Sequence, residues 1–138
     1  MADADPYAAL RDRMADVSGV VMIIGDTDTG KTGLAKTLMR DAVEAGRKVA
    51  FIDADVASAN VGPAACVGLK LLAEPADLET FSTPDELRFV GSVEPHGVVL
   101  PHVVAVTSLV DIATRNADLV ILDTTNAVAG VVGQTLKY

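Results

Sequence analysis

The sequence predicts an α/β fold with a mainly parallel sheet, and two observations support this prediction. Short apolar runs rich in Val and Ile alternate along the 138 residues with segments whose apolar residues recur three and four positions apart. The first pattern is typical of strands buried on both faces, and the second is typical of amphipathic helices. Alternating strands and helices form parallel sheets with right-handed crossovers. We therefore expect three layers, with helices on both faces of one sheet.

The expected elements follow one another without an internal repeat. They are, in chain order, a polar helix at residues 6–16, a strand at 20–24, a helix ending near Gly46, a strand at 49–52, a strand at 87–90, a helix at 101–115 and a strand at 119–122. Small residues between positions 56 and 68 predict a loop with a short helix, and an unassigned apolar stretch follows at 69–72. We expect residues 1–18 to form an N-terminal helical extension and residues 19–138 to form the domain.

Composition and charge restrict the function classes. The formal net charge is −8, which argues against a surface that holds nucleic acid non-specifically, because phosphate binding depends on Lys and Arg. No apolar run reaches the roughly 18–20 residues of a membrane span, and the acidic N-terminus does not resemble a signal peptide. The single Cys66 cannot form an internal disulfide. We expect a cytoplasmic protein that does not bind a membrane.

A glycine-bounded loop lies between the first apolar run and the helix that follows it. Residues 25–32 fit the pattern G-x-x-x-x-G-K-[ST] of a phosphate-binding P-loop. In such a loop, backbone N–H groups and the positive end of the helix face phosphate oxygens, and the lysine reaches the β- and γ-phosphates. The residues expected to bind a nucleoside triphosphate are Gly25, Asp26, Thr27, Asp28, Thr29, Gly30, Lys31, Thr32 and Gly33. The fold expectation is therefore a P-loop NTPase sandwich; four strands make such a domain thin, so we expect it to be incomplete at its C-terminus.

Three aspartates follow the expected strands. Asp53 and Asp55 lie at the end of the second apolar run, and Asp123 follows the last one. Because ligands bind beyond the carboxyl ends of parallel strands, these carboxylates should converge with Gly25 on one edge. Together with the Thr32 hydroxyl, they are the candidate Mg²⁺ ligands.

Beyond the P-loop pattern, the chain resembles the polynucleotide 5′-hydroxyl kinases, a family that includes the kinase subunit of the pre-mRNA cleavage machinery and a ribosomal-RNA-processing kinase. Asp28 gives the loop the form G-x-x-D-x-G-K-[ST] found in that family. The further matching segments occur in the family's order at residues 53–56, 61–63, 67–69, 89–92, 95–101, 122–125 and 130–137. The resemblance covers nearly the whole chain from about residue 20 onward.

The resemblance implies transfer of the γ-phosphate of ATP to the 5′-hydroxyl of an RNA or DNA end, with Mg²⁺ as cofactor. It implies that Lys31 stabilises the migrating charge and that Asp55 orients the hydroxyl, with a possible role as general base. The residues that match the start of the family's lid segment are Thr124, Thr125 and Asn126, although the family carries Gly at the last of these positions. Ala57 and Ser58 stand where the family carries Gly-Gln.

Two other functions stay open at this point. The Ala57-Ser58 change and the acidic surface favour a catalytically weak nucleotide-binding scaffold that organises a partner protein or a homo-oligomer. An ATPase of the partitioning type ranks third, because such enzymes carry an extra signature lysine early in the P-loop, where this chain has Asp26 and Thr27.

Overall fold

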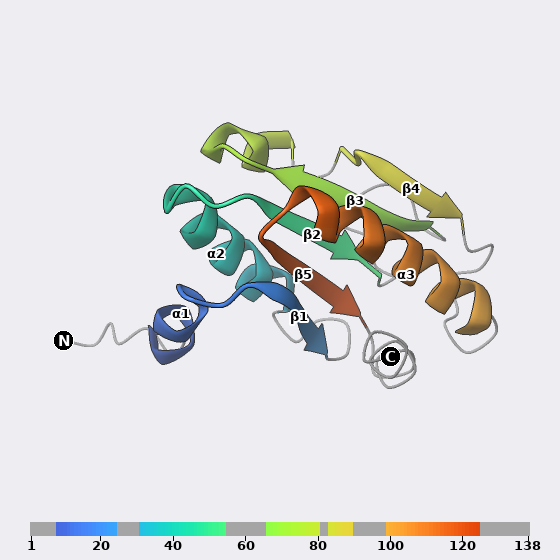
Figure 1. Cartoon of the computed structure of the whole chain (residues 1–138), viewed down its shortest axis with the longest axis horizontal. Coiled ribbons are helices and arrows are strands. Elements are labelled where there is room, and N and C mark those ends of the chain that lie inside the picture. Colours follow the sequence, from blue (N-terminus) through green and yellow to red (C-terminus); the bar gives the residue numbers. More distant parts are fainter. Residues whose placement is uncertain (1–7, 25–30, 55–65, 81–82, 90–98, 125–138) are drawn as a thin grey trace.

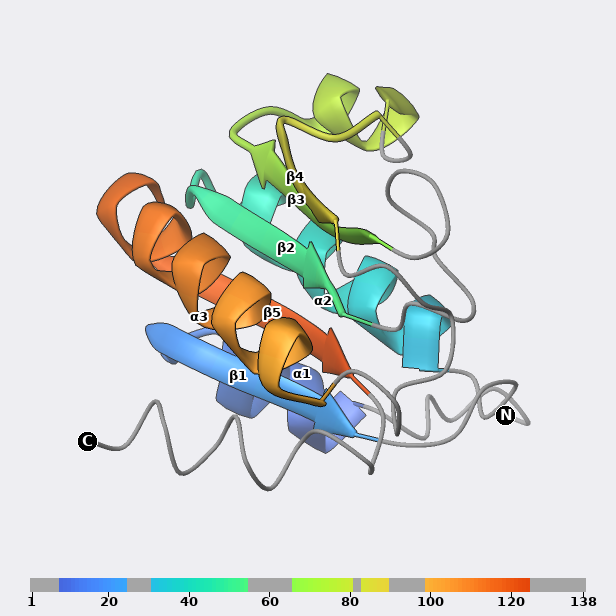
Figure 2. The same cartoon turned by 90° about the vertical axis from the view of Figure 1, so that its right-hand side faces the viewer.

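The computed structural model describes residues 8–24, 31–54, 66–80, 83–89 and 99–124, and shows one five-stranded sheet between helices (Figure 1). Helix α3 covers one face of the sheet and helix α2 covers the other, which confirms the α/β sandwich (Figure 2). The elements are α1 (Ala8–Met14), β1 (Gly19–Ile24), α2 (Lys31–Glu44), β2 (Val49–Asp53), β3 (Cys66–Leu72), the 3₁₀ helix η1 (Pro75–Thr80), β4 (Glu86–Phe89), α3 (Val99–Asn116) and β5 (Leu119–Thr124). Among the helices in these ranges, none is long and apolar enough to cross a membrane.

The sheet has the strand order β1-β5-β2-β3-β4 and divides into two parts. We call β1, β5 and β2, which pair in parallel, together with α2, the parallel half. We call β3 and β4, which pair antiparallel with β2 and with each other, together with η1, the antiparallel flank. Because β3 reverses the chain and β4 reverses it again, β4 points in the same direction as β2 (Figure 1).

The expectation of four strands was wrong, because residues 66–72 form an additional strand, β3. The small residues up to position 68 predict a loop for residues 66–68. Gly68 and Lys70 interrupt the apolar pattern of this segment, yet both residues are buried in the sheet. The predicted strand at 87–90 is β4, which begins one residue earlier, at Glu86.

An apolar core lies on each face of the sheet. The core under α3 contains Val103, Val106, Leu109, Val110 and Ala113 of the helix, packed on alternate residues of β2, β3 and β5. These five residues are the inner face expected from the sequence. The core under α2 contains Ala35, Leu38, Met39, Ala42 and Val43 of that helix, with Val49 and Phe51 of β2 and Leu119 and Ile121 of β5. Each strand therefore alternates between the two cores, as the pleat of a buried strand requires.

Helix α2 ends where the sequence predicts. Gly46 has a φ of 81°, the left-handed conformation that glycine adopts most readily. Its N–H donates to the Val43 carbonyl at 3.0 Å, and the Arg47 N–H donates to the Ala42 carbonyl at 3.0 Å. This pair of bonds is a Schellman motif, which satisfies the last carbonyls of the helix.

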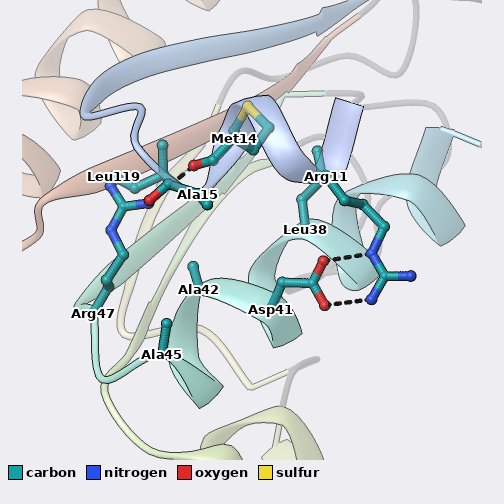
Figure 3. Close-up of a pocket in the computed structure, with 9 residues that line it drawn as sticks. All are labelled: Arg11, Met14, Ala15, Leu38, Asp41, Ala42, Ala45, Arg47 and Leu119. Carbon is teal, nitrogen blue, oxygen red and sulfur yellow. Dashed lines mark hydrogen bonds and ion pairs between the residues drawn. The ribbon is translucent and has the colours of Figure 1, made fainter. Parts of the chain in front are cut away.

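Two arginines attach α1 to α2, as Figure 3 shows. The Arg11 guanidinium donates to both carboxylate oxygens of Asp41, at 2.6 and 2.8 Å. Arg47, just beyond α2, donates to the Met14 carbonyl at 3.2 Å and to the Val17 carbonyl. A cation at the C-terminal end of a helix is favourable, because the last carbonyls carry partial negative charge. The predicted N-terminal helix is thus present, and it packs at the rim of the sheet.

Candidate functional site

The ends of the parallel strands bring two of the three predicted aspartates together. In the register of the sheet, Ile23 of β1 lies opposite Asp123 of β5, and Asp123 lies opposite Asp53 of β2. The Ala54 N–H donates to the Asp123 carbonyl at 2.8 Å, so the backbones stay paired up to this point. The prediction that Asp53 and Asp123 converge on one edge is confirmed. Asp55, together with Gly25, lies outside the described residues.

Both carboxylates point to the α2 face of the sheet. Asp53 alternates with Phe51, and Asp123 alternates with Ile121, and both of these apolar residues pack in the core under α2. Asp53 and Asp123 are each 1% exposed. Two neighbouring buried carboxylates repel each other and lose hydration, so this arrangement favours a nearby positive charge.

Helix α2 supplies such a charge at the same edge. It begins at Lys31, seven residues after the end of β1, and runs antiparallel to the strands, because its C-terminal Schellman motif lies near the opposite edge. Its N-terminus, with the partial positive charge of the helix dipole, is therefore at the edge that carries the carboxylates. The predicted phosphate-binding residues 25–30 lie outside the described residues, as do the side chains of Lys31 and Thr32. Gly33, in the first turn of α2, is exposed.

The Mg²⁺ site stays a prediction. Within the described ranges there is no group of three side chains of the types that bind metal ions. Asp53 and Asp123 provide two carboxylates, while Asp55 and the Thr32 side chain, the remaining candidates, lie outside those ranges. Carboxylate and hydroxyl oxygens are the donors that Mg²⁺ prefers, so the chemistry of this set fits that ion.

The predicted lid segment begins at the last residue of β5, Thr124. Thr124 is fully buried at 0% exposure and lies opposite Ile24 in the register. By alternation, its side chain points to the α3 face, away from Asp123. Thr125 and Asn126 lie outside the described residues, so their role in a lid stays a prediction.

The row of residues through the aspartates continues into the antiparallel flank, which the sequence reasoning missed. Gly68 of β3 lies opposite Asp53, and Leu87 of β4 lies opposite Gly68. Recognising β3 as a strand would have revealed this row. The signal was weak, because a glycine and a lysine stand in the middle of the segment.

A small cavity at the other end of the sheet is separate from this site. It has a volume of about 60 Å³ and lies between α1, α2 and the first residue of β5, Leu119 (Figure 3). Arg11 and Arg47 line it, and both guanidiniums are engaged in the contacts that hold α1. The cavity is therefore a packing feature of the N-terminal helix, and the convergent carboxylates mark the candidate site.

Comparison with known proteins shows the family of the chain. A family model described as the P-loop of the mRNA cleavage and polyadenylation factor CLP1 matches residues 25–138. A polyribonucleotide 5′-hydroxyl-kinase of Pyrococcus furiosus is 38% identical over 115 residues, which cover 80% of this chain and 31% of the relative. A protein with the same kinase name from Methanocaldococcus jannaschii is 31% identical over 110 residues, covering 80% of this chain and 30% of the relative.

A vertebrate relative matches over a shorter stretch. The polyribonucleotide 5′-hydroxyl-kinase Clp1 of Gallus gallus is 36% identical over 59 residues, covering 43% of this chain and 14% of the relative. The chain thus spans about a third of the length of the archaeal relatives. The family match extends over most of the chain and includes the P-loop, α2 and both convergent aspartates. The chain therefore belongs to the CLP1 P-loop family.

Proposed function

We propose that this chain is the nucleotide-binding part of an ATP-dependent polynucleotide 5′-hydroxyl kinase that acts on RNA. The observation that carries the proposal is the pairing of Asp53 with Asp123 on the α2 face, at the edge where α2 begins. The kinase names of the relatives support the reaction type, and the word polyribonucleotide in those names supports RNA as the acceptor.

In the proposed reaction, the 5′-hydroxyl oxygen of the acceptor attacks the γ-phosphorus of ATP. A new P–O bond forms as the bond between the γ-phosphorus and the β,γ-bridging oxygen breaks, and ADP leaves. Asp55 would accept the hydroxyl proton, and Lys31 would stabilise the charge on the migrating phosphoryl group.

The buried aspartates have a different task in this scheme. Asp123, with Asp53 and Thr32, would hold Mg²⁺, which when bound neutralises charge on the β- and γ-phosphates. Their burial fixes both carboxylates in position before the nucleotide arrives, so little reorganisation is needed when it binds. We further propose a cytoplasmic location, which the single Cys66 supports.

A nucleotide-binding scaffold is the second candidate, and one sequence observation favours it. The Ser58 side chain is shorter than the glutamine that the kinase family carries there, and Ala57 replaces the neighbouring glycine. A scaffold would bind ATP through the same loop and would transfer no phosphate.

One assay separates the two candidates. The full-length protein is incubated with γ-labelled ATP, Mg²⁺ and 5′-hydroxyl RNA and DNA oligonucleotides, beside the variant Lys31→Ala. A kinase labels the oligonucleotide, with RNA preferred, and Lys31→Ala lowers the rate by about 10²–10³-fold. ATP binding without any labelled oligonucleotide would refute the kinase and leave the scaffold.

A further inference from the structure

Phe89, the last residue of β4, is unusually exposed for an aromatic side chain. It is 78% exposed, more than any other large apolar residue in the described part of the chain. A single exposed apolar side chain is common on protein surfaces, but an aromatic ring also offers a flat apolar face on which a nucleic-acid base can stack.

The position of Phe89 relates it to the candidate site. Because β4 points in the same direction as β2, its last residue lies at the edge of the sheet that carries Asp53 and Asp123 (Figure 1). Phe89 lies opposite Cys66, two residues beyond the Leu87–Gly68 pair of the aspartate row. Residues opposite each other in a sheet point to the same face, and so do residues two apart in a strand. Phe89 therefore points to the α2 face, as both aspartates do.

Sheet geometry gives the distance between Phe89 and Asp53. Two strand spacings and two residue rises place the Phe89 Cα about 12 Å from the Asp53 Cα. This is within the span of the first two nucleotides of a single strand whose 5′-hydroxyl is at the carboxylates. A base at that distance can lie on the exposed ring.

The charges near Phe89 favour stacking over phosphate contact. Arg88, the neighbouring cation, lies opposite Val67, whose side chain packs in the core under α3, so Arg88 points to the other face. Its guanidinium is 3.6 Å from a carboxylate oxygen of Glu86. With a net charge of −8, the chain has little general attraction for a polyanion, and stacking on an aromatic ring does not depend on charge.

We propose that Phe89 is the stacking platform for one of the first two bases of the single-stranded acceptor. This inference rests on the proposed polynucleotide kinase function, and it makes Phe89 a substrate-positioning residue of that reaction. Its ring holds the 5′ end of the strand over the α2 face, so that the hydroxyl stays near the reacting phosphate.

A kinetic experiment tests whether Phe89 contributes to binding of the acceptor strand. In the chain, Phe89→Ala is expected to raise the KM for a 5′-hydroxyl RNA oligonucleotide about 5- to 100-fold and to leave the KM for ATP within about twofold. Phe89→Tyr should restore the KM. Val104→Ala, at an exposed apolar position of α3 on the opposite face, is the matched control and should change neither constant. An oligonucleotide without its first two bases should be equally poor for the wild type and for Phe89→Ala. The proposal would be overturned if Phe89→Ala left the KM for the intact oligonucleotide unchanged, or if it raised the KM for the abasic strand as much as the KM for the intact one.

A binding experiment tests base stacking at position 89 even if no phosphate is transferred. The chain contains no tryptophan, so Phe89→Trp introduces a single tryptophan at the proposed platform. Stacking predicts that a 5′-hydroxyl oligonucleotide quenches its emission and that the abasic strand quenches it much less. Quenching without kinase activity would support the platform and refute the kinase, whereas activity without base-dependent quenching would refute the platform alone. An absence of both, or quenching by an added protein and not by oligonucleotide, would also refute the platform.

Discussion

Within one sheet, β2 and β5, the strands of the parallel half that carry the two aspartates, differ in burial from β4 and η1, the outer elements of the antiparallel flank. Every residue of β2 and β5 is buried, whereas β4 is exposed at three of its four positions and η1 contains no buried residue. Dense packing on both faces fixes the carboxylates of the parallel half in position. Among the described residues of the flank, Phe89, at the same edge, is largely exposed. In the proposed kinase, the difference separates two tasks, because a rigid site serves the phosphates and an accessible surface serves the acceptor strand.

The largest expected effect tests the parallel half. Asp123→Asn removes one of the two opposed carboxylates and, with it, the proposed metal ligand. We expect the rate of γ-phosphate transfer to fall about 10²–10³-fold, while the variant stays folded, because the Asn side chain has nearly the size and shape of the Asp side chain that it replaces. Single-turnover transfer measures the rate, and urea unfolding checks that the variant is folded.

Asp118→Asn is the matched control for this change. Asp118 is exposed and directly precedes the first residue of β5, at the opposite edge of the sheet. Its substitution should alter the transfer rate by less than about twofold, since exposed charges far from the site act weakly. Equal losses in the two variants would contradict the placement of the transfer site at the edge of the sheet that carries Asp123.

The second prediction concerns the flank. The Asp85 carboxylate accepts a hydrogen bond from the Leu71 N–H at 2.7 Å and lies 3.9 Å from the Nζ atom of the buried Lys70. Asp85→Ala leaves the N–H without this acceptor and the ammonium without this carboxylate. We expect a loss of about 2 kcal/mol in the free energy of unfolding, measured with urea.

Glu86→Ala, at the neighbouring residue and the first of β4, is the control. Its exposed pair with Arg88, at 3.6 Å, should contribute less than about 1 kcal/mol to the free energy of unfolding.

In the folded Asp85→Ala protein, ATP affinity should stay unchanged while the KM for the oligonucleotide rises, because the changed contacts position the strand that carries Phe89. A loss of ATP affinity alone would show that the two regions do not act separately.

The sequence predicts these two regions unequally, for a physical reason. The strands of the parallel half are uninterrupted apolar runs that end in Asp53 and Asp123, so their buried centres and polar ends are both local signals. In β3, Lys70 is 7% exposed, and its burial depends on a carboxylate fifteen residues later in the sequence. Such a pairing is tertiary information that periodicity does not contain. The exposure of Phe89 was equally hidden, because it follows from the position of β4 at the edge of the sheet.

The third prediction concerns the end of helix α2 at Gly46, which the sequence predicts correctly. Gly46→Ala places a side chain on a residue with a φ of 81°, although the space around it is open. We expect a loss of about 1 kcal/mol in the free energy of unfolding from backbone strain alone. Gly33→Ala, in the first turn of the same helix and also in open space, should raise stability by up to about 1 kcal/mol. If both variants shifted stability in the same direction, the Schellman motif would not be what ends α2.

The smallest expected effect concerns η1 and depends on pH. The Ala73 and Glu74 N–H groups donate to the Asp77 carboxylate at 2.8 and 3.0 Å, and these bonds hold its pKa below the ordinary value. A lowered pKa in the folded state means that the carboxylate adds stability above the ordinary value, and that this stability is lost as the pH falls through the folded value. Asp77→Asn should therefore cost about 0.5–1 kcal/mol at pH 7 and nothing at a pH below the folded pKa.

Urea unfolding of both proteins across this pH range measures the difference. Glu79→Gln removes an exposed carboxylate from the same short helix and should give a stability difference that is small at every pH. A gap between wild type and Asp77→Asn that stays constant from pH 7 to acid would assign the effect to packing and not to the two charged hydrogen bonds. A gap that closes in acid would instead show that a single carboxylate orders the start of η1, in the region where β3 ends and the flank is otherwise exposed.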